Sequence, residues 1–261
     1  MSHLRVWWDA DADGGSNMGA DECLAMEARR RGCPLVRIYG WRPASVSLGR
    51  FQKLEDARAV AEIAGVPLVR RPSGGGAIVH GSDLTYAAAV PRGHPWAASP
   101  QRLYDALHGA MAGVLAGYGL PAELCAATSA AAERPDDEPF FCFDRRSAGD
   151  IVVAVDGPRP VKVMGSAQRR LEGVVLQHGS LLLRGNPAVT GRARHAGITD
   201  LPGFTSDLSD RRELPRRWLA RVAADLGAEL VEEPGDFRRV AADDLIGVAR
   251  RFSDAGWTAR R

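Results

Sequence analysis

Cysteine is scarce in this sequence, and the spacing of the few cysteines excludes two common roles. The 261 residues include four, at Cys23, Cys33, Cys125 and Cys142. No two of them form a CxxC pair, and no group has the spacing of a zinc site. We therefore expect free thiols in an intracellular protein rather than a disulfide-stabilised scaffold. Packing alone explains most such thiols, so a functional cysteine requires a special neighbourhood.

Net charge and long apolar runs are also lacking. The chain has 34 basic and 32 acidic residues, which leave a net charge of +2. This balance disfavours nucleic acid as the main partner, because binding to a phosphate backbone requires clustered positive charge. The weakly polar stretch 107–120 is too short to cross a bilayer, and the first residues resemble no export signal. We therefore expect a cytoplasmic protein without a membrane partner.

The distribution of apolar residues predicts a mixture of strands and helices. Gly and Pro separate strand-like runs at 35–39, 45–48, 67–71, 77–80, 84–90, 150–155, 161–164 and 174–183. Helices are predicted at 17–31, with Ser16 or Asn17 as its cap, and at 55–63, 100–118, 213–226 and 240–252. Because the strands occur in runs instead of alternating regularly with helices, the pattern indicates an α+β fold. We expect one domain at 1–205, followed by a helical extension at 206–261.

Two polar segments are predicted to be irregular. The acidic segment 9–14 has the residue types of a calcium loop, but an EF-hand needs a glutamate where Ala20 stands, and a preceding helix. We interpret it as a polar turn. Residues 126–139 are rich in Ala, Glu and Asp, which predicts a mobile loop.

Three consecutive glycines, Gly74, Gly75 and Gly76, separate two predicted strands in the segment RRPSGGGAIVH at 70–80. Ordering three glycines costs much backbone entropy. Such a loop is useful where a ligand lies against backbone N–H groups. The segment has neither the Gly-Lys-Ser/Thr of a P-loop nor the helix that follows a dinucleotide-binding motif. A flexible hairpin turn is the simple alternative.

A lysine and a cysteine are candidates for chemistry. Lys162, in the apolar segment VKVMGSAQ, either reaches a cleft or extends into water at a sheet edge. Cys142 lies among aromatic residues in FFCF, where a buried core thiol is the common outcome. A reactive cysteine requires a nearby cation or backbone dipoles. Cys142 precedes one predicted strand and Lys162 lies on the next, so the two approach each other if these strands pair.

Five separated segments resemble the lipoate–protein ligase and octanoyltransferase family. They are NM and DE within 17–22, SVSLGRFQ at 45–52, RRPSGGGAIVH at 70–80, KVMGSAQ at 162–168 and LQHGS at 176–180. The resemblance spans roughly residues 17–183. It implies the biotin/lipoate ligase catalytic fold, with mixed, largely antiparallel sheets flanked by helices, and makes 1–205 a catalytic acyltransferase or ligase domain.

The family contains two chemistries. Ligases activate lipoate with ATP and transfer it to a lysine of a lipoyl domain, whereas octanoyltransferases take octanoate from acyl carrier protein, in one branch through a cysteine thioester. Cys142 with Phe143, DLTY at 83–86 and QHGS at 177–180 resemble that cysteine-dependent, LipM-type branch. Gly76 stands where octanoyltransferases usually have arginine. A glycine at this position resembles the ligase form of the loop. We favour the octanoyltransferase, which requires no cofactor. The alternatives are an ATP- and Mg-dependent lipoate–protein ligase and a non-catalytic acyl- or lipoyl-binding module.

The resemblance also implies roles for individual residues. Cys142 is the expected nucleophile, and Lys162 is the expected cation beside it. The residues expected to bind substrate are Arg71, Ser73, Gly74, Gly75, Gly76, Ala77, His80, Gly165, Ser166, Ala167, His178 and Gly179. Ile78, Val163 and Met164 are expected to line a tunnel for the acyl chain, and no metal site is expected. The expected partners are octanoyl–acyl carrier protein and the lipoyl domains of 2-oxoacid dehydrogenases or the glycine-cleavage H protein.

Overall fold

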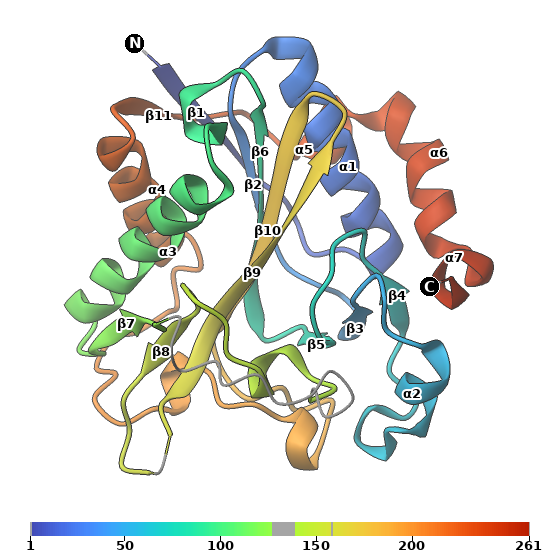
Figure 1. Ribbon diagram of the computed structural model, residues 1–261, viewed down its shortest axis with the longest axis vertical. Coiled ribbons are helices and arrows are strands. Elements are labelled where there is room, and N and C mark those ends of the chain that lie inside the picture. Colours follow the sequence, from blue (N-terminus) through green and yellow to red (C-terminus); the bar gives the residue numbers. More distant parts are fainter. Residues whose placement is uncertain (1, 127–138, 158, 261) are drawn as a thin grey trace.

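The computed structural model describes residues 2–126, 139–157 and 159–260, which form two sheets flanked by helices (Figure 1). The strands of the larger sheet are β1 (Ser2–Trp8), β2 (Leu35–Tyr39), β6 (Asp83–Pro91), β7 (Ala122–Leu124), β8 (Ile151–Val153), β9 (Val161–Leu171), β10 (Val174–Leu182) and β11 (Ala228–Glu232). The smaller sheet contains β3 (Ser45–Leu48), β4 (Leu68–Arg70) and β5 (Ile78–His80). The helices are α1 (Gly14–Arg31), α2 (Leu54–Ala59), α3 (Pro100–Gly117), α4 (Glu213–Asp225), α5 (Phe237–Val240), α6 (Ala242–Ser253) and α7 (Ala255–Ala259).

The larger sheet has the strand order β11-β1-β2-β6-β10-β9-β8-β7. β1 pairs in parallel with both β2 and β11, and the remaining neighbours in this sheet pair antiparallel. The central strand β10 is buried along its whole length, because helices cover both faces of the sheet. The mixed, largely antiparallel α+β prediction is confirmed.

Helices form a layer on each face of the larger sheet (Figure 1). On one face, α3 and α4 pack together, and Trp218 of α4 donates its indole N–H to the carbonyl of Leu107 at 2.7 Å. The predicted apolar face of α3, from Leu103 to Leu115, is buried there. On the other face, α1 packs against α6. Among the described residues, no helix is both long enough and apolar enough to cross a membrane.

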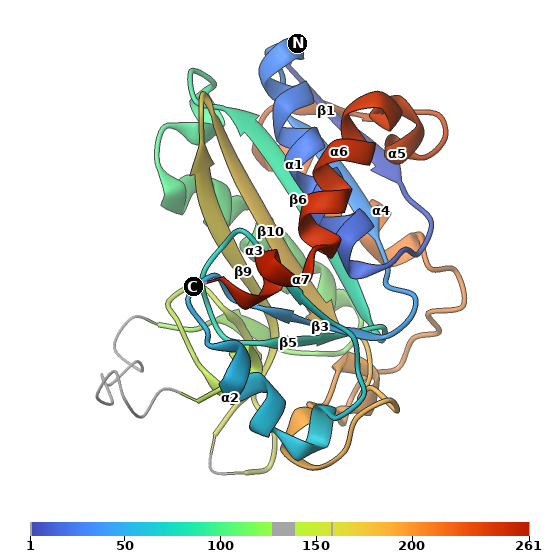
Figure 2. The ribbon, with the colours of Figure 1, turned by 90° about the vertical axis from the view of Figure 1, so that its right-hand side faces the viewer.

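The smaller sheet lies on the α1 side of the larger one, with α2 on its outer side (Figure 2). Its order is β4-β3-β5, and the glycine loop connects β4 to β5. The segment before Cys142 is held against this loop, because Ala77 forms a bridge with Phe141. The amide of Cys142 then donates to the carbonyl of Ala77 at 2.8 Å. The smaller sheet thus fixes the position of the cysteine.

Some boundaries differ from the sequence prediction. Asp13, not Ser16 or Asn17, caps α1, because its carboxylate accepts the amide of Ser16 at 3.0 Å. β9 continues to Leu171 through polar residues that did not indicate a strand. β1, β7, β11 and α7 were not predicted. β11 also places part of the expected helical extension in the larger sheet, while the boundary at 205 stays a prediction. The expected mobile loop falls almost wholly at 127–138, outside the described residues.

Candidate active site

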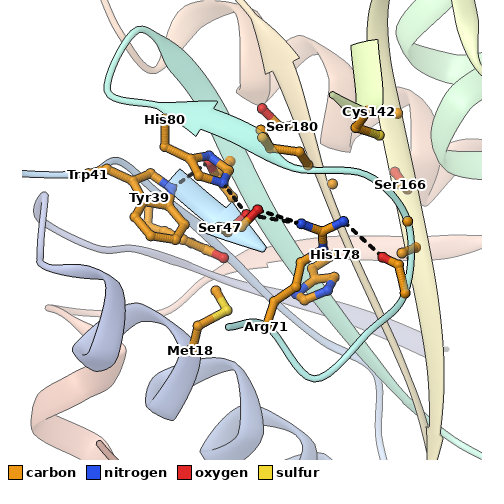
Figure 3. A pocket seen from close by; sticks show the side chains of 17 residues that line it. Met18, Tyr39, Trp41, Ser47, Arg71, His80, Cys142, Ser166, His178 and Ser180 are labelled. Atoms are coloured by element: carbon orange, nitrogen blue, oxygen red, sulfur yellow. Dashed lines mark hydrogen bonds between the residues drawn. The ribbon is translucent and has the colours of Figure 1, made fainter. Parts of the chain in front are cut away.

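A partly open pocket lies where the glycine loop, the Cys142 turn and strands β9 and β10 meet (Figure 3). Its polar lining is Ser47, Arg71, His80, Thr85, Ser166, His178 and Ser180. Its remaining lining is Met18, Tyr39, Trp41, Gly74, Gly75, Ile78, Cys142, Gly165, Ala167 and Gly179. The pocket therefore combines apolar walls with a few polar groups and one thiol.

Cys142 and Lys162 meet at the edge of this pocket. The Nζ of Lys162 lies 3.7 Å from the Sγ of Cys142 and donates to the Cys142 carbonyl at 3.2 Å. Pairing of β8 with β9 sets this approach, since Val152 opposes Lys162 and the Cys142 turn contacts β9. Lys162 is 4% exposed, so it does not extend into water at a sheet edge. Cys142 lines the pocket, which distinguishes it from a core thiol.

Asp150 orients the lysine. Its Oδ2 lies 2.7 Å from the Nζ of Lys162, and both side chains are almost completely buried. The same carboxylate accepts the amide of Ser147 at 2.7 Å and the hydroxyl of Tyr104 at 3.1 Å. A buried ion pair persists only where its remaining hydrogen bonds are satisfied, as they are here. The Lys162 ammonium is thereby held between the Asp150 carboxylate, the Cys142 carbonyl and the Cys142 thiol.

Arg71 is a second buried cation at the pocket, and it braces the glycine loop. Its guanidinium donates to the carbonyls of Ser47, Gly74 and Gly76 at 2.7–2.8 Å. Burial lowers the pKa of Arg71 to about 10, although the nearby Cys142 opposes this shift. Gly75, at φ +91°, turns the chain in a backbone region that favours glycine. The loop is consequently ordered by the arginine and is not a free hairpin.

Several glycines are required by close packing around these groups. A Cβ at Gly165 would lie 2.8 Å from the Cε of Lys162, and one at Gly179 would lie 2.1 Å from the Oγ of Ser166. A Cβ at Gly76 would lie 2.7 Å from the Cys142 amide and 2.9 Å from the Nε of Arg145. Position 76 therefore has no room for a side chain in this arrangement of the Cys142 turn.

Two histidines at the pocket each bridge a serine and an aspartate. His80 contacts Ser47 Oγ through Nε2 at 2.8 Å and Asp83 Oδ2 through Nδ1 at 2.7 Å. Its ring also stacks on Trp41, with centroids 3.9 Å apart. His178 contacts Ser73 Oγ through Nε2 and Asp21 Oδ2 through Nδ1 at 3.0 Å. Both histidines have both ring nitrogens engaged, so the orientation of each ring is fixed.

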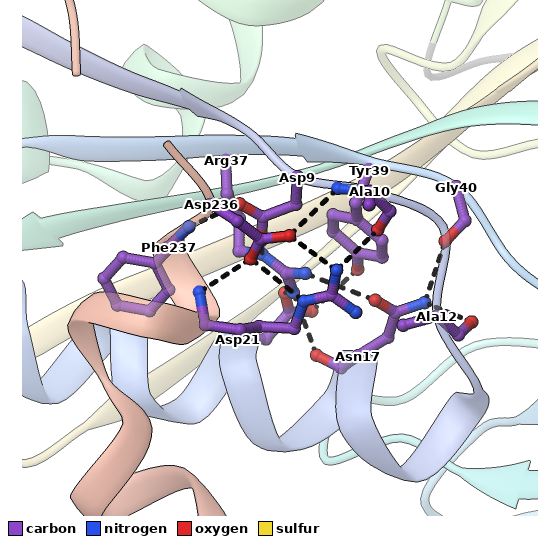
Figure 4. Close-up of polar contacts among 11 residues, drawn as sticks. Asp9, Ala10, Ala12, Asn17, Asp21, Arg37, Tyr39, Gly40, Asp236 and Phe237 are labelled. Carbon is purple, nitrogen blue, oxygen red and sulfur yellow. Dashed lines mark hydrogen bonds and ion pairs between the residues drawn. The ribbon is translucent and has the colours of Figure 1, made fainter. Parts of the chain in front are cut away.

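The contact between His178 and Asp21 joins this histidine to a buried network of charged residues. The network includes Asp9 of the segment that was predicted to be a polar turn (Figure 4). Asp21 accepts from Arg37 Nη1 at 2.8 Å, and Asp9 accepts from Arg37 Nε at 2.7 Å. Burial opposes ionisation of Arg37, but the two carboxylates raise its pKa. Asp9 also accepts the amide of Phe237, which joins the C-terminal segment to the network at 2.7 Å. The acidic segment is therefore partly a core element and not simply a turn.

A third hydrogen-bonded chain lies behind Ser166. The Oγ of Ser166 contacts His108 Nε2 at 2.6 Å and the hydroxyl of Tyr86 at 2.7 Å. The Nδ1 of His108 faces the carbonyl of Gly149 at 2.8 Å. Burial lowers the pKa of His108 to about 3, so this imidazole is neutral near pH 7. Tyr86 also accepts from the amide of Gln177 at 2.8 Å, which completes the chain.

Most residues predicted for the site reach the pocket. Those that line it are Arg71, Gly74, Gly75, His80, Cys142, Gly165, Ser166, Ala167, His178 and Gly179. Ser73, Gly76, Ala77 and Lys162 lie directly behind the lining. The prediction that Val163 and Met164 line the pocket was wrong, because both belong to the core between the larger sheet and α3. Ile78 does line it, and Met18 and Trp41 supply apolar surface that the sequence did not indicate.

The partners of the predicted histidines were missed. Ser47, Asp83 and Asp21 each stand in a segment quoted for the family resemblance, but no spacing rule connected them to a histidine. Asp150 was taken only as the start of a strand. Among the described residues, no three His, Cys, Asp or Glu side chains cluster as metal ligands.

The fold and the sequence together define the class of protein. Residues 13–200 match the family described as the lipoyl protein ligase A/B catalytic domain, and the chain belongs to this family. Among its relatives, the octanoyltransferase LipM of Anoxybacillus flavithermus is 39% identical over 192 residues, which are 69% of this chain and 66% of that protein. LipM of Geobacillus kaustophilus is 39% identical over 177 residues, 64% of this chain and 60% of that protein. The chain thus matches less than two thirds of the length of either relative.

Solved structures give the same fold. A lipoate-protein ligase A structure bound with ATP has a TM-score of 0.69 at 20% identity and covers 99% of both chains. The bi-partite lipoate protein ligase from Thermoplasma acidophilum has a TM-score of 0.69 at 20% identity, and covers 99% of this chain and 97% of its own. At this identity the likeness is one of fold.

Proposed function

We propose that this chain is an octanoyltransferase that moves octanoate from acyl carrier protein to a lysine of a lipoyl domain or glycine-cleavage H protein, through a thioester on Cys142. The observation that supports this most is the Sγ of Cys142, which lines the pocket 3.7 Å from the ammonium of Lys162. The 39% identity to LipM octanoyltransferases supports the same assignment. The proposed location is the cytoplasm, where these substrates occur.

In the first step, the thiolate of Cys142 attacks the carbonyl carbon of the octanoyl thioester. A new C–S bond forms, the bond to the carrier's sulfur breaks, and the carrier leaves as a thiolate that takes a proton from water. The ammonium of Lys162 stabilises negative charge, first on the sulfur and then on the carbonyl oxygen, by a charge-assisted hydrogen bond. Asp150 keeps this ammonium in place.

In the second step, an amine of the acceptor protein attacks the octanoyl–Cys142 thioester. The bond broken in each step is an activated thioester, and the second step forms a more stable amide, so neither step requires ATP or another cofactor. The acyl chain would lie along the apolar lining formed by Met18, Trp41 and Ile78.

A lipoate–protein ligase is the second candidate, and the glycine at position 76 favours it, because that is the ligase form of the loop. In that case Lys162 and the glycine loop would hold the carbonyl and phosphate of an acyl adenylate. ATP and Mg would then be required, and Cys142 would be dispensable.

Intact mass spectrometry separates the two. The protein is incubated with octanoyl–acyl carrier protein without ATP, and we expect a mass gain of one octanoyl group that Cys142→Ala abolishes. Cys125→Ala is the matched control and should keep the adduct. Modification of a lipoyl domain by free lipoate and ATP, in wild type and Cys142→Ala alike and without any adduct, would establish the ligase instead. Binding of octanoate with neither reaction would indicate a binding module.

A further inference from the structure

The donor of the proposed reaction carries its octanoyl group on a long, charged arm. In an acyl carrier protein the thioester sulfur belongs to a phosphopantetheine group, whose other end is a phosphodiester. About 13 bonds separate the sulfur from the phosphorus, a length of about four extended residues or roughly 15 Å. A cation at that distance from the reactive thiol could hold the phosphate by charge-assisted hydrogen bonds. This reasoning rests on the proposed function.

The pocket reaches the surface at the tip of the glycine loop and along β9. Gly75 lines the pocket and is exposed, and Ala167 lines it and is partly exposed. Gly165, two positions earlier on β9, is buried beside the reactive groups. A Cβ there would lie 3.0 Å from the Nζ of Lys162, which is 3.7 Å from the Sγ of Cys142. An arm bound to this thiol can therefore leave the pocket along β9.

Arg169 stands on β9 at the outer end of this path. Alternate residues of a strand share a face, so Gly165, Ala167 and Arg169 all face the side of the sheet on which the pocket lies. Four positions along a strand correspond to roughly 13 Å, which places Arg169 at about the length of the arm from the reactive groups. Arg169 is partly exposed and donates to the carbonyl of Pro72, before the glycines, at 3.2 Å.

Arg50 and Phe51 lie against the next residues of the same loop. The backbone amide of Arg50 donates to the carbonyl of Ser73 at 2.8 Å, and a Cβ at Gly74 would lie 3.9 Å from the Phe51 ring. The Arg50 guanidinium lies 5.7 Å from the centroid of this ring. Phe51 is 73% exposed, more than any other large apolar side chain of the described residues. An exposed phenyl group beside a cation suits the arm, which carries two methyl groups next to its phosphate.

The positive charge at this rim is not compensated. Within the described part of the chain, neither Arg50 nor Arg169 forms an ion pair; Glu22, whose charge reaches Arg169, is bound to Arg251 at 2.5 Å. Burial and the charge of Arg50 lower the pKa of Arg169, so the two guanidinium groups are close enough to repel each other. Beneath them Arg70 is 2% exposed and donates to backbone carbonyls, including that of Arg50. A bound anion would relieve this repulsion.

We propose that Arg50 and Arg169 form a subsite for the phosphodiester of the phosphopantetheine arm, with Phe51 against the methyl groups beside it. The arm runs from Cys142 along β9 and past the tip of the glycine loop, and its phosphate lies between the two guanidinium groups. Arginine suits this role because its planar group forms paired hydrogen bonds to phosphate oxygens. Lys162 cannot take this role, because it lies beside the sulfur at the opposite end of the arm.

Two small donors isolate the phosphate in the test. Octanoyl pantetheine and octanoyl phosphopantetheine share the thioester and the methyl groups, and they differ only in the phosphate. Loading of Cys142 without ATP is followed in a single turnover by intact mass spectrometry, at donor concentrations below saturation. We expect the wild type to load about tenfold faster from the phosphorylated donor, the effect of a net hydrogen bond to a charged group.

The variants assign this preference to the two arginines. Arg50→Gln and Arg169→Gln should each lower the preference by about threefold, and the double variant should load from both donors at about equal rates. The ratio of the two rate constants is unaffected by a general loss of activity, so it reports on the phosphate alone. Arg58→Gln removes the same charge from an exposed position on α2 and is the matched control, which should keep the full preference. Arg169→Lys keeps the charge and should keep part of it.

Three results would overturn the subsite and leave the proposed function intact. They are equal loading of the wild type from both small donors, a preference that survives in the double variant, and slower loading of the double variant from octanoyl–acyl carrier protein alone. The last result would place the arginines against the protein surface of the carrier and not against its arm. Absence of an adduct from all three donors in the wild type would instead overturn the proposed function, and the subsite with it.

Discussion

Arg37 and Lys162 are both buried cations held by carboxylates, yet they differ in the partners that their remaining donors face. Arg37 binds two carboxylates and two oxygens of Asn17, and its guanidinium lies over Tyr39 at 3.9 Å. Lys162 binds one carboxylate and one carbonyl, and its remaining neighbour is the sulfur of Cys142. The cation that binds only oxygen atoms of the core joins segments of the chain. The cation that also faces a sulfur at the pocket can respond to charge that develops there.

The choice of residue type fits this difference. Lys53 and Lys162 are the two lysines of the sequence, and arginine occupies the other basic positions. The planar guanidinium suits fixed, multidentate contacts, whereas the compact ammonium can follow a single changing partner. The comparison predicts that loss of Arg37 mainly changes stability and loss of Lys162 mainly changes activity.

The largest effect is expected from Arg37→Met. The substitution leaves the carboxylates of Asp9 and Asp21 buried without their cation, so the free energy of unfolding should fall by about 5 kcal/mol. Urea unfolding followed by circular dichroism measures it. Arg30→Met, which removes an exposed i,i+3 partner of Glu27, is the control and should change stability by less than about 1 kcal/mol. Equal effects of the two substitutions would contradict a central role for Arg37.

Lys162→Met should lower the transfer rate by about 10²–10³-fold, the range for loss of one charge-stabilising donor. It should also reduce the free energy of unfolding by about 3 kcal/mol, because Asp150 keeps two donors but loses its cation. Adding Asp150→Asn should restore much of the stability and none of the activity. Recovery of both in the double variant would show that the lysine acts only through folding.

Gly165→Ala tests whether the position of the ammonium matters. The new Cβ would lie 2.8 Å from Cε and 3.0 Å from Nζ of Lys162, so the side chain must move. We expect single-turnover loading of Cys142 to slow by about 10- to 100-fold. Gly109→Ala is the control, since a Cβ there meets nothing within 4 Å on α3. That change should leave loading intact and stabilise the helix by about 0.5–1 kcal/mol.

The smallest effect is expected in the alkylation of two thiols, Cys23 near Arg37 and Cys142 beside Lys162. Cys23 lies in the α1 core beneath the Arg37 network, and burial raises its pKa to about 11. It is therefore a neutral thiol at pH 7 and becomes a thiolate only as the pH approaches that value. Limited alkylation with iodoacetamide at pH 7, followed by peptide mass mapping, should label Cys142 and leave Cys23 unmodified. Labelling of Cys23 first would reverse this assignment.

The parts of the site that the sequence revealed depend on local pairing. Consecutive strands and a short turn bring Lys162 towards Cys142, and the three glycines mark the loop that holds the cysteine segment. The first of these contacts forms between segments that are close in the sequence, so the local pattern of residues is enough to predict it. The largely antiparallel sheet was likewise predictable from runs of strands and from the family resemblance.

The parts that were missed depend on distant segments. His178 and Asp21 are 157 positions apart, and nothing in either segment indicates the other. Val163 and Met164 were misplaced because apolar residues on a strand between two covered faces do not reveal which face they occupy. β11 was missed because it is short, lies between two helices and contains charged residues, so its sequence lacks the apolar run that predicts a strand.

The pairing of β1 with β11 has a consequence for folding. The two strands join residues about 226 positions apart, for example Ser2 with Ala228, and Asp9 receives the amide of Phe237 soon after. Contacts of such long sequence separation form slowly, because a large loop must close before they contribute. During synthesis, β1 can pair with β11 only after residues 228–232 have left the ribosome. Until then the outer edge of β1 is unpaired and exposed to association with other chains.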